Sequence, residues 1–131
     1  MDTEEKTGNS VRFDVTVFEP YRYVEQGVVR KDVVSRIIDS YLLHTPPLLQ
    51  SLQEAIREGD ARRAWESAHS LKSSSSMVGG KRLASYCLDM EKLGRQGSLT
   101  RQYMQSQLEK ILQEFEYVKA RLLEMKQGLP E

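Results

Sequence analysis

Apolar side chains recur at intervals of three and four residues along most of this chain, the spacing that gathers them on one face of an α-helix. The first long run starts at about Lys31 and ends at Gly59. The sequence Thr45-Pro46-Pro47 interrupts it. We expect a kink or a break there, because the residue before a proline avoids the α-helical conformation.

Three further segments carry the same periodicity. They span residues 61–78, about 83–91 and about 98–127. Asp60 is a suitable N-cap for the first of them, and glycines separate each segment from the next. Helices joined by short connections pack antiparallel to their neighbours. We therefore predict an all-α fold, an up-and-down four-helix bundle with one or two additional N-terminal helices.

The start of the chain lacks this periodicity. Residues 1–12 are mostly polar, so we expect a disordered N-terminal lead-in, followed by a helical bundle domain over residues 13–127. Asp14 can cap a short helix. Apolar and polar residues alternate only briefly, from Val11 to Val17, and we predict no β-strand.

Composition narrows the class of protein. A chain of 131 residues suits one domain. The 19 basic and 19 acidic residues balance, so no basic surplus favours nucleic acid as a partner. The single cysteine, Cys87, excludes an internal disulfide and fits a reducing compartment. No apolar run approaches the roughly 18 to 20 residues that span a bilayer. We expect a cytoplasmic monomer without a membrane partner.

His69 is the strongest candidate for chemistry. On a helix of about 100° per residue, His69 falls on the polar side of segment 61–78, opposite small and apolar residues such as Ala68 and Leu71. A neutral imidazole is a competent nucleophile near pH 7. A phosphoryl group on its nitrogen would carry close to two negative charges. Lys72, one helical turn further on, could offset part of this charge.

The residues around His69 also form a known pattern. Ala68-His69-Ser70-Leu71-Lys72, followed by small residues and a glycine, resembles the signature of histidine-containing phosphotransfer (HPt) domains. The resemblance covers about residues 14 to 126. One departure is Ser73, which stands where the family has a glycine. Further matches at the family's usual spacing are Gly59-Asp60, Leu83, Cys87, Leu88 and Glu91.

This resemblance implies a phosphorelay intermediate of two-component signalling. His69 would accept a phosphoryl group from the aspartate of a receiver domain and pass it to the aspartate of another receiver. The implied partners are response-regulator receiver domains and a hybrid sensor histidine kinase. Lys72 would steady the charge of the phosphoryl oxygens. No cofactor is implied for this chain, because the receiver carries the Mg²⁺.

The polar side of the same helix is expected to form the receiver docking surface. Its predicted members are Trp65, Arg62, Ser73, Ser76 and Gly79. Trp65 lies about 40° from His69 on the helical wheel, and aromatic residues are enriched at the centres of interfaces. The alternative is an indole that lies flat across a neighbouring helix.

Other chemistry finds little support. The sequence has no glycine-rich phosphate loop and no paired acids for Mg²⁺, so we expect no autonomous kinase activity. His44 and His69 fall on different predicted segments without matched ligands, so no metal site is predicted. We place His44 at a helix end, next to the prolines. A second function stays open, a helical adaptor that binds receiver or other signalling domains without being phosphorylated.

Overall fold

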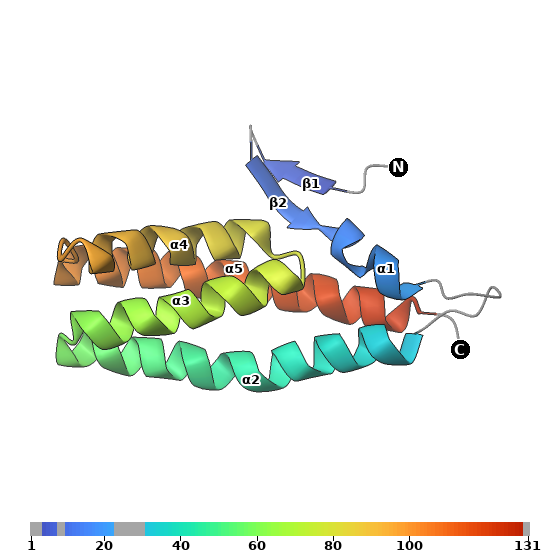
Figure 1. The fold of residues 1–131 in the computed structure, drawn as a ribbon, viewed down its shortest axis with the longest axis horizontal. Helices are drawn as coiled ribbons and strands as arrows, with labels where there is room; N and C mark the ends of the chain where they lie inside the picture. The colour runs from blue at the N-terminus through green and yellow to red at the C-terminus, as the bar shows by residue number, and fades with distance from the viewer. Residues whose placement is uncertain (1–3, 8–9, 23–30, 130–131) are drawn as a thin grey trace.

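The computed structural model describes residues 4–7, 10–22 and 31–129 (Figure 1). Within these residues, four long helices run alternately up and down and form the bundle. They are α2 (Lys31–Glu58), α3 (Ala61–Met77), α4 (Lys81–Arg95) and α5 (Arg101–Gln127). The predicted four-helix bundle is therefore confirmed.

Side-chain caps mark two of the helix starts. The carboxylate of Asp60 accepts a hydrogen bond from the backbone N–H of Arg63, as the sequence predicted for α3. The hydroxyl of Thr100 accepts one from the N–H of Tyr103 at the start of α5. Each bond satisfies a backbone donor that the helix itself leaves without a partner.

The prolines do not break α2, which runs as one helix through Pro46 and Pro47. A proline inside a helix removes one backbone hydrogen bond. Here both rings lie on the exposed side, while Thr45 and Leu49 on the inner side are buried in the bundle. Tertiary packing of the inner side thus outweighs the local preference for a break. His44 consequently lies inside the helix and not at its end, and its Nδ1–H donates to the carbonyl oxygen of Ser40 over 2.8 Å.

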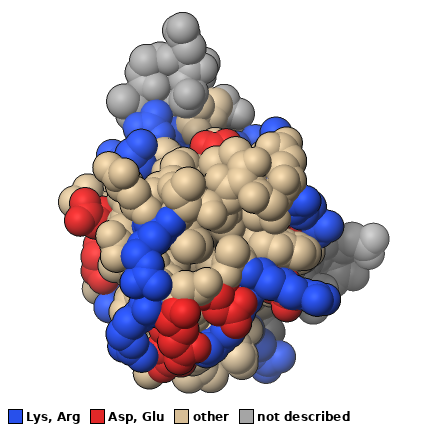
Figure 2. Space-filling view, turned by 90° about the vertical axis from the view of Figure 1, so that its left-hand side faces the viewer, with Lys and Arg blue, Asp and Glu red and all other residues tan. Residues whose placement is uncertain are grey.

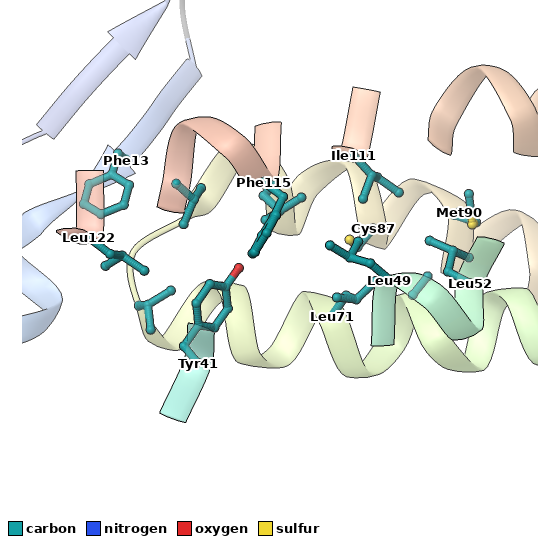
Figure 3. Packing of buried hydrophobic residues seen from close by; sticks show 14 of the residues in the cluster. Phe13, Tyr41, Leu49, Leu52, Leu71, Cys87, Met90, Ile111, Phe115 and Leu122 are labelled. Atoms are coloured by element: carbon teal, nitrogen blue, oxygen red, sulfur yellow. The ribbon is translucent and has the colours of Figure 1, made fainter. Parts of the chain in front are cut away.

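The hydrophobic core runs along the axis of the bundle and draws side chains from all four helices (Figure 3). Leu52, Leu71, Met90 and Ile111 are among its fully buried members. One polar contact lies inside this core, a hydrogen bond of 2.9 Å between the hydroxyls of Tyr41 and Ser75. Ser75, fully buried on the inner side of α3, thus gives the Tyr41 hydroxyl a partner inside the bundle.

Cys87 belongs to the same core. Its side chain is fully buried, and burial raises the pKa of the thiol to about 12. A thiol with such a pKa stays protonated at neutral pH and behaves as a small apolar residue.

The N-terminal segment differs from the prediction. Two short antiparallel strands, β1 (Glu4–Thr7) and β2 (Ser10–Asp14), form a hairpin, with Thr7 paired to Ser10 and Glu4 paired to Asp14. The prediction of no strand is wrong, because part of the expected lead-in over residues 1–12 is extended and paired. A short 3₁₀ helix, η1 (Val15–Phe18), and α1 (Glu19–Arg22) follow. Asp14 caps η1 as predicted, accepting from the N–H of Thr16.

Contacts with α5 explain why β2 forms although the local alternation of apolar and polar residues is brief. Phe13 is fully buried and meets the ring of Tyr117 edge to face, at 6.4 Å between ring centroids. Arg12 donates to both carboxylate oxygens of the buried Glu114, over 2.9 and 3.1 Å. These partners lie about a hundred residues away in the sequence, so a local pattern could not reveal them.

The hairpin also reaches the turn between α3 and α4. The backbone N–H of Asp14 donates to the carbonyl oxygen of Gly79 over 2.9 Å. Gly79 has a φ of +88°, which residues with a side chain rarely adopt, and a Cβ atom there would overlap the carbonyl oxygen of Asp14. The turn therefore requires glycine for two independent reasons.

We predict that Gly79→Ala destabilises the fold more than Gly97→Ala. Gly97 has a similar φ of +71°, but a Cβ atom there meets no other atom within 4 Å. The control should therefore lose roughly 1 kcal/mol, the cost of the left-handed conformation alone. Gly79→Ala should lose roughly 1 to 3 kcal/mol more, because the N-terminal segment must move away. Urea unfolding measures both variants, and equal losses would contradict the steric argument.

Candidate functional site

His69 lies on the outer side of α3, and its side chain is 49% exposed. The opposite side of the helix, with Ala64, Ala68 and Leu71, is fully buried. The sequence pattern therefore placed His69 correctly, in reach of an approaching molecule.

A buried carboxylate on α4 holds the imidazole in place. The side chain of Glu91 is only 5% exposed, and its Oε2 atom lies 2.6 Å from Nδ1 of His69. Its other oxygen, Oε1, accepts from the ammonium of Lys72 over 2.7 Å. Arg95, one turn further along α4, donates to Oε2 from Nε over 3.1 Å, and its Nη2 lies 3.0 Å from the same oxygen. One carboxylate thus joins three donors from two helices.

These donors decide the charge of Glu91. Burial acts to raise the pKa of the carboxyl group, but hydrogen bonds from Lys72, His69 and Arg95 outweigh it and hold the pKa at about 2. Glu91 is therefore ionised at neutral pH and can only accept hydrogen bonds.

The ionised carboxylate selects one tautomer of His69. Because Glu91 cannot donate, the proton of their hydrogen bond must sit on Nδ1 of the imidazole. In the neutral form of the ring, Nε2 on the other side then carries the lone pair. The arrangement turns Nε2 of the imidazole away from Glu91.

Trp65 packs against α4 and supports Arg95. A Cβ atom added to Gly94 would overlap the indole, so the absent side chain of this glycine is what lets Trp65 lie against the helix. The guanidinium of Arg95 lies over the indole, 4.6 Å from the ring centroid. Of the two placements considered for Trp65, the structure has the indole across a neighbouring helix, partly buried.

The other predicted docking residues divide into two groups. Arg62 is exposed and pairs with Glu66 over 2.8 Å, and Ser73 and Ser76 are also exposed on α3. Gly79 is buried beneath Asp14 at the far end of the helix. We therefore correct the expectation for Gly79, whose surface is covered by the N-terminal segment.

Charges of both signs adjoin each other at the end of the bundle that holds the α2–α3 and α4–α5 connections (Figure 2). Arg63, for example, pairs with Glu54 over 2.9 Å and with Glu58 over 3.3 Å. A partner that approaches this end would therefore contact positive and negative side chains next to each other, and not a surface of one charge.

Sequence reasoning missed the roles of Glu91 and Arg95. It noted Glu91 as a match to the family spacing and within an apolar stripe, but assigned it no partner. An acid at a position that faces the core is a signal in itself, since a buried carboxylate needs donors. Arg95 follows at i+4, the spacing of a helical ion pair. No comparable local signal connects either residue to His69, which lies on another helix.

The described part of the chain holds no group of three or more His, Cys, Asp and Glu side chains that could bind a metal ion. Among the helices that it contains, none is both long and apolar enough to cross a membrane.

Comparison with known proteins places this geometry in a family. The model of the Hpt domain matches residues 36–124. The chain belongs to the Hpt domain family. Its structure is similar to the crystal structure of histidine-containing phosphotransfer protein B (HptB) from Pseudomonas aeruginosa PAO1, with a TM-score of 0.76 and 29% sequence identity. The similarity covers 88% of this chain and 95% of HptB. The search of the curated proteins returned no match.

Membership of the Hpt family confirms the resemblance on which the sequence analysis relied. It assigns the chain to histidine phosphotransfer in two-component signalling. Hpt proteins work with receiver domains, so receivers are its class of partner.

We predict that Glu91→Gln destabilises the protein at neutral pH and not in strong acid. The folded pKa of about 2 lies below the ordinary value of 4.5. The charge therefore contributes stability above about pH 4.5, and this contribution is lost as the pH falls toward 2. At pH 7 the variant should lose roughly 1 to 3 kcal/mol, because its partners lose a charged acceptor.

The measurement is urea unfolding of both proteins between pH 7 and pH 2. Glu109→Gln, at an exposed position on α5, is the matched control and should leave stability nearly unchanged. A loss for Glu91→Gln that stays constant over this range would show that packing, and not charge, is responsible.

Proposed function

We propose that this protein is a phosphorelay intermediate, which accepts a phosphoryl group on Nε2 of His69 from a receiver aspartate and passes it to another receiver. The observation that carries the proposal is the 2.6 Å hydrogen bond between Nδ1 of His69 and the ionised Glu91. It supports an oriented and half-exposed imidazole with the proton on Nδ1, so that Nε2 is the nitrogen that would attack an aspartyl phosphate.

In the transfer step, the lone pair of Nε2 attacks phosphorus in line with the bond to the aspartate oxygen. The N–P bond forms while the P–O bond breaks, and the electron pair of that bond leaves with the aspartate carboxylate. The proton on Nδ1 stays in place, so the ring becomes cationic. Glu91, already in contact with Nδ1, faces this developing charge and stabilises it. The reverse sequence delivers the phosphoryl group to the second receiver.

Lys72 is proposed to lower the charge around the phosphoryl group. Lys72 lies one helical turn from His69, and its ammonium donates a hydrogen bond to Glu91. The side chain is 27% exposed. In this position it adds positive potential at the ring without blocking Nε2. The partner receiver would supply the Mg²⁺ and the aspartate, and the chain itself would need no cofactor.

The surface proposed for receiver docking is the exposed side of α3. The predicted members Arg62, Ser73 and Ser76 are exposed on the helix that carries His69. Serines near the histidine leave room for another molecule to approach, although Ser73 is larger than the glycine of the family. We further propose that the protein acts as a monomer in the cytoplasm, with receivers and a hybrid sensor kinase as its partners.

The decisive experiment is phosphotransfer from a phosphorylated receiver. We predict that the wild-type protein takes up an acid-labile label, whereas His69→Gln takes up none and remains folded. His44→Gln is the matched control, since His44 is the other histidine of the chain, and it should label normally. Label on His69→Gln at the wild-type level would place the acceptor elsewhere. Receiver binding without any label on the wild-type protein would favour the adaptor function.

A further prediction tests whether Lys72 affects the rate of phosphotransfer more than another lysine of the chain does. Lys72→Ala should slow phosphotransfer about tenfold, because a partly exposed donor contributes less than the fully buried ones of other enzymes. Lys92→Ala removes an exposed lysine of α4 and should leave the rate unchanged. Rapid-quench kinetics measure both rates, and equal rates for the two variants would exclude the proposed role.

A further inference from the structure

Arg95 is the most exposed cation of the site. Its side chain is 55% exposed, against 27% for Lys72, although both bind the same carboxylate. The guanidinium shares the Oε2 atom of Glu91 with Nδ1 of His69, so it lies next to the imidazole. Of its five N–H donors, those on Nε and Nη2 contact Glu91. Donors therefore remain for a second acceptor.

The aromatic ring beneath Arg95 keeps it near the histidine. Trp65 lies 4.6 Å from the guanidinium and is itself seated against Gly94. An arginine stacked on an indole loses less conformational freedom when it forms a new hydrogen bond. The stack therefore provides a cation that is both ordered and accessible.

Charge balance explains why such a cation is needed. Before phosphorylation, Glu91 carries one negative charge, and Lys72 and Arg95 carry one positive charge each. A phosphoryl group on His69 carries close to two negative charges, of which the cationic ring offsets one. Glu91 then stands near like charge, which favours the transfer of one of its cations to the phosphoryl oxygens. Arginine binds such oxygens through parallel N–H groups.

We infer that Arg95 binds the phosphoryl group of phosphorylated His69, and that Trp65 is the positioning residue that holds its guanidinium in reach. The inference rests on the proposed function and adds to it a residue that responds to phosphorylation. It also assigns Trp65 to the interior of the site, in place of the docking role that its sequence position indicated.

The test uses phosphoramidate, a small phosphoryl donor, so that no partner protein is involved. The first measurement is the rate at which label is lost from phosphorylated His69 at pH 7. Arg95→Gln should lose its label about three to ten times faster than the wild type, because a charge-assisted contact is gone. Arg95→Lys should recover part of the lifetime. Lys92→Gln, which removes an exposed charge from the same helix, should behave as the wild type.

Trp65 supplies the second measurement, because it is the one tryptophan in the sequence. Movement of the guanidinium away from the indole should change its fluorescence when the wild type is phosphorylated. The same treatment of Arg95→Gln should leave the emission nearly unchanged. Trp65→Phe retains a ring and should preserve the phosphohistidine lifetime, whereas Trp65→Leu should shorten it toward that of Arg95→Gln.

The outcomes separate this inference from the proposed function. A wild-type protein that takes label on His69 but shares its lifetime with Arg95→Gln would overturn the role of Arg95 alone. Equal lifetimes for Trp65→Phe and Trp65→Leu would overturn the role of the ring. A wild-type protein that takes no label on His69, from phosphoramidate or from a receiver, would overturn the proposed function as well. Should Trp65→Leu fail to fold, the Arg95 variants still decide.

Discussion

The buried carboxylate of Glu91 imposes the central constraint on this molecule. Removing such a charge from water costs several kcal/mol unless donors surround it. The donors come from two helices: Lys72 and His69 on α3, and Arg95 on α4. Satisfying one acid therefore fixes how α3 and α4 lie against each other, orients the imidazole and chooses its protonated nitrogen. The reactivity proposed for His69 follows from an electrostatic requirement of the fold.

The packing of the bundle makes this arrangement possible. α3 presents small side chains to its neighbours, among them Ala64, Ala68 and Ser75, all of them buried. Close helix packing allows the side chain of Glu91 on α4 to reach His69 and Lys72 on α3. The hairpin secures the other end of α3, where Asp14 bonds to Gly79. The site thus lies on a helix that packs against the bundle along its inner side and contacts the N-terminal segment at its C-terminal end.

The helices and the exposure of His69 were predictable because both follow from periodicity within one segment. The features that were not predictable depend on contacts between distant segments. Strand β2 owes its position to Phe13 and Arg12 against α5, and α2 continues through Pro46 because its inner side is buried. For the candidate site, the pattern indicated His69 and Lys72 but not the acid that joins them. A helical wheel shows which way a side chain faces, but it does not show which residues of other helices the side chain contacts.

The contact between Trp65 and Gly94 has a consequence for how this sequence can change over evolutionary time. Because any side chain at position 94 would occupy the space of the indole, Gly94 cannot vary while Trp65 is present. A lineage that acquires a larger residue on α4 must first, or at once, accept a smaller one on α3. The two positions, 29 residues apart in the sequence, are thus coupled in one direction, because a change at position 94 depends on a change at position 65.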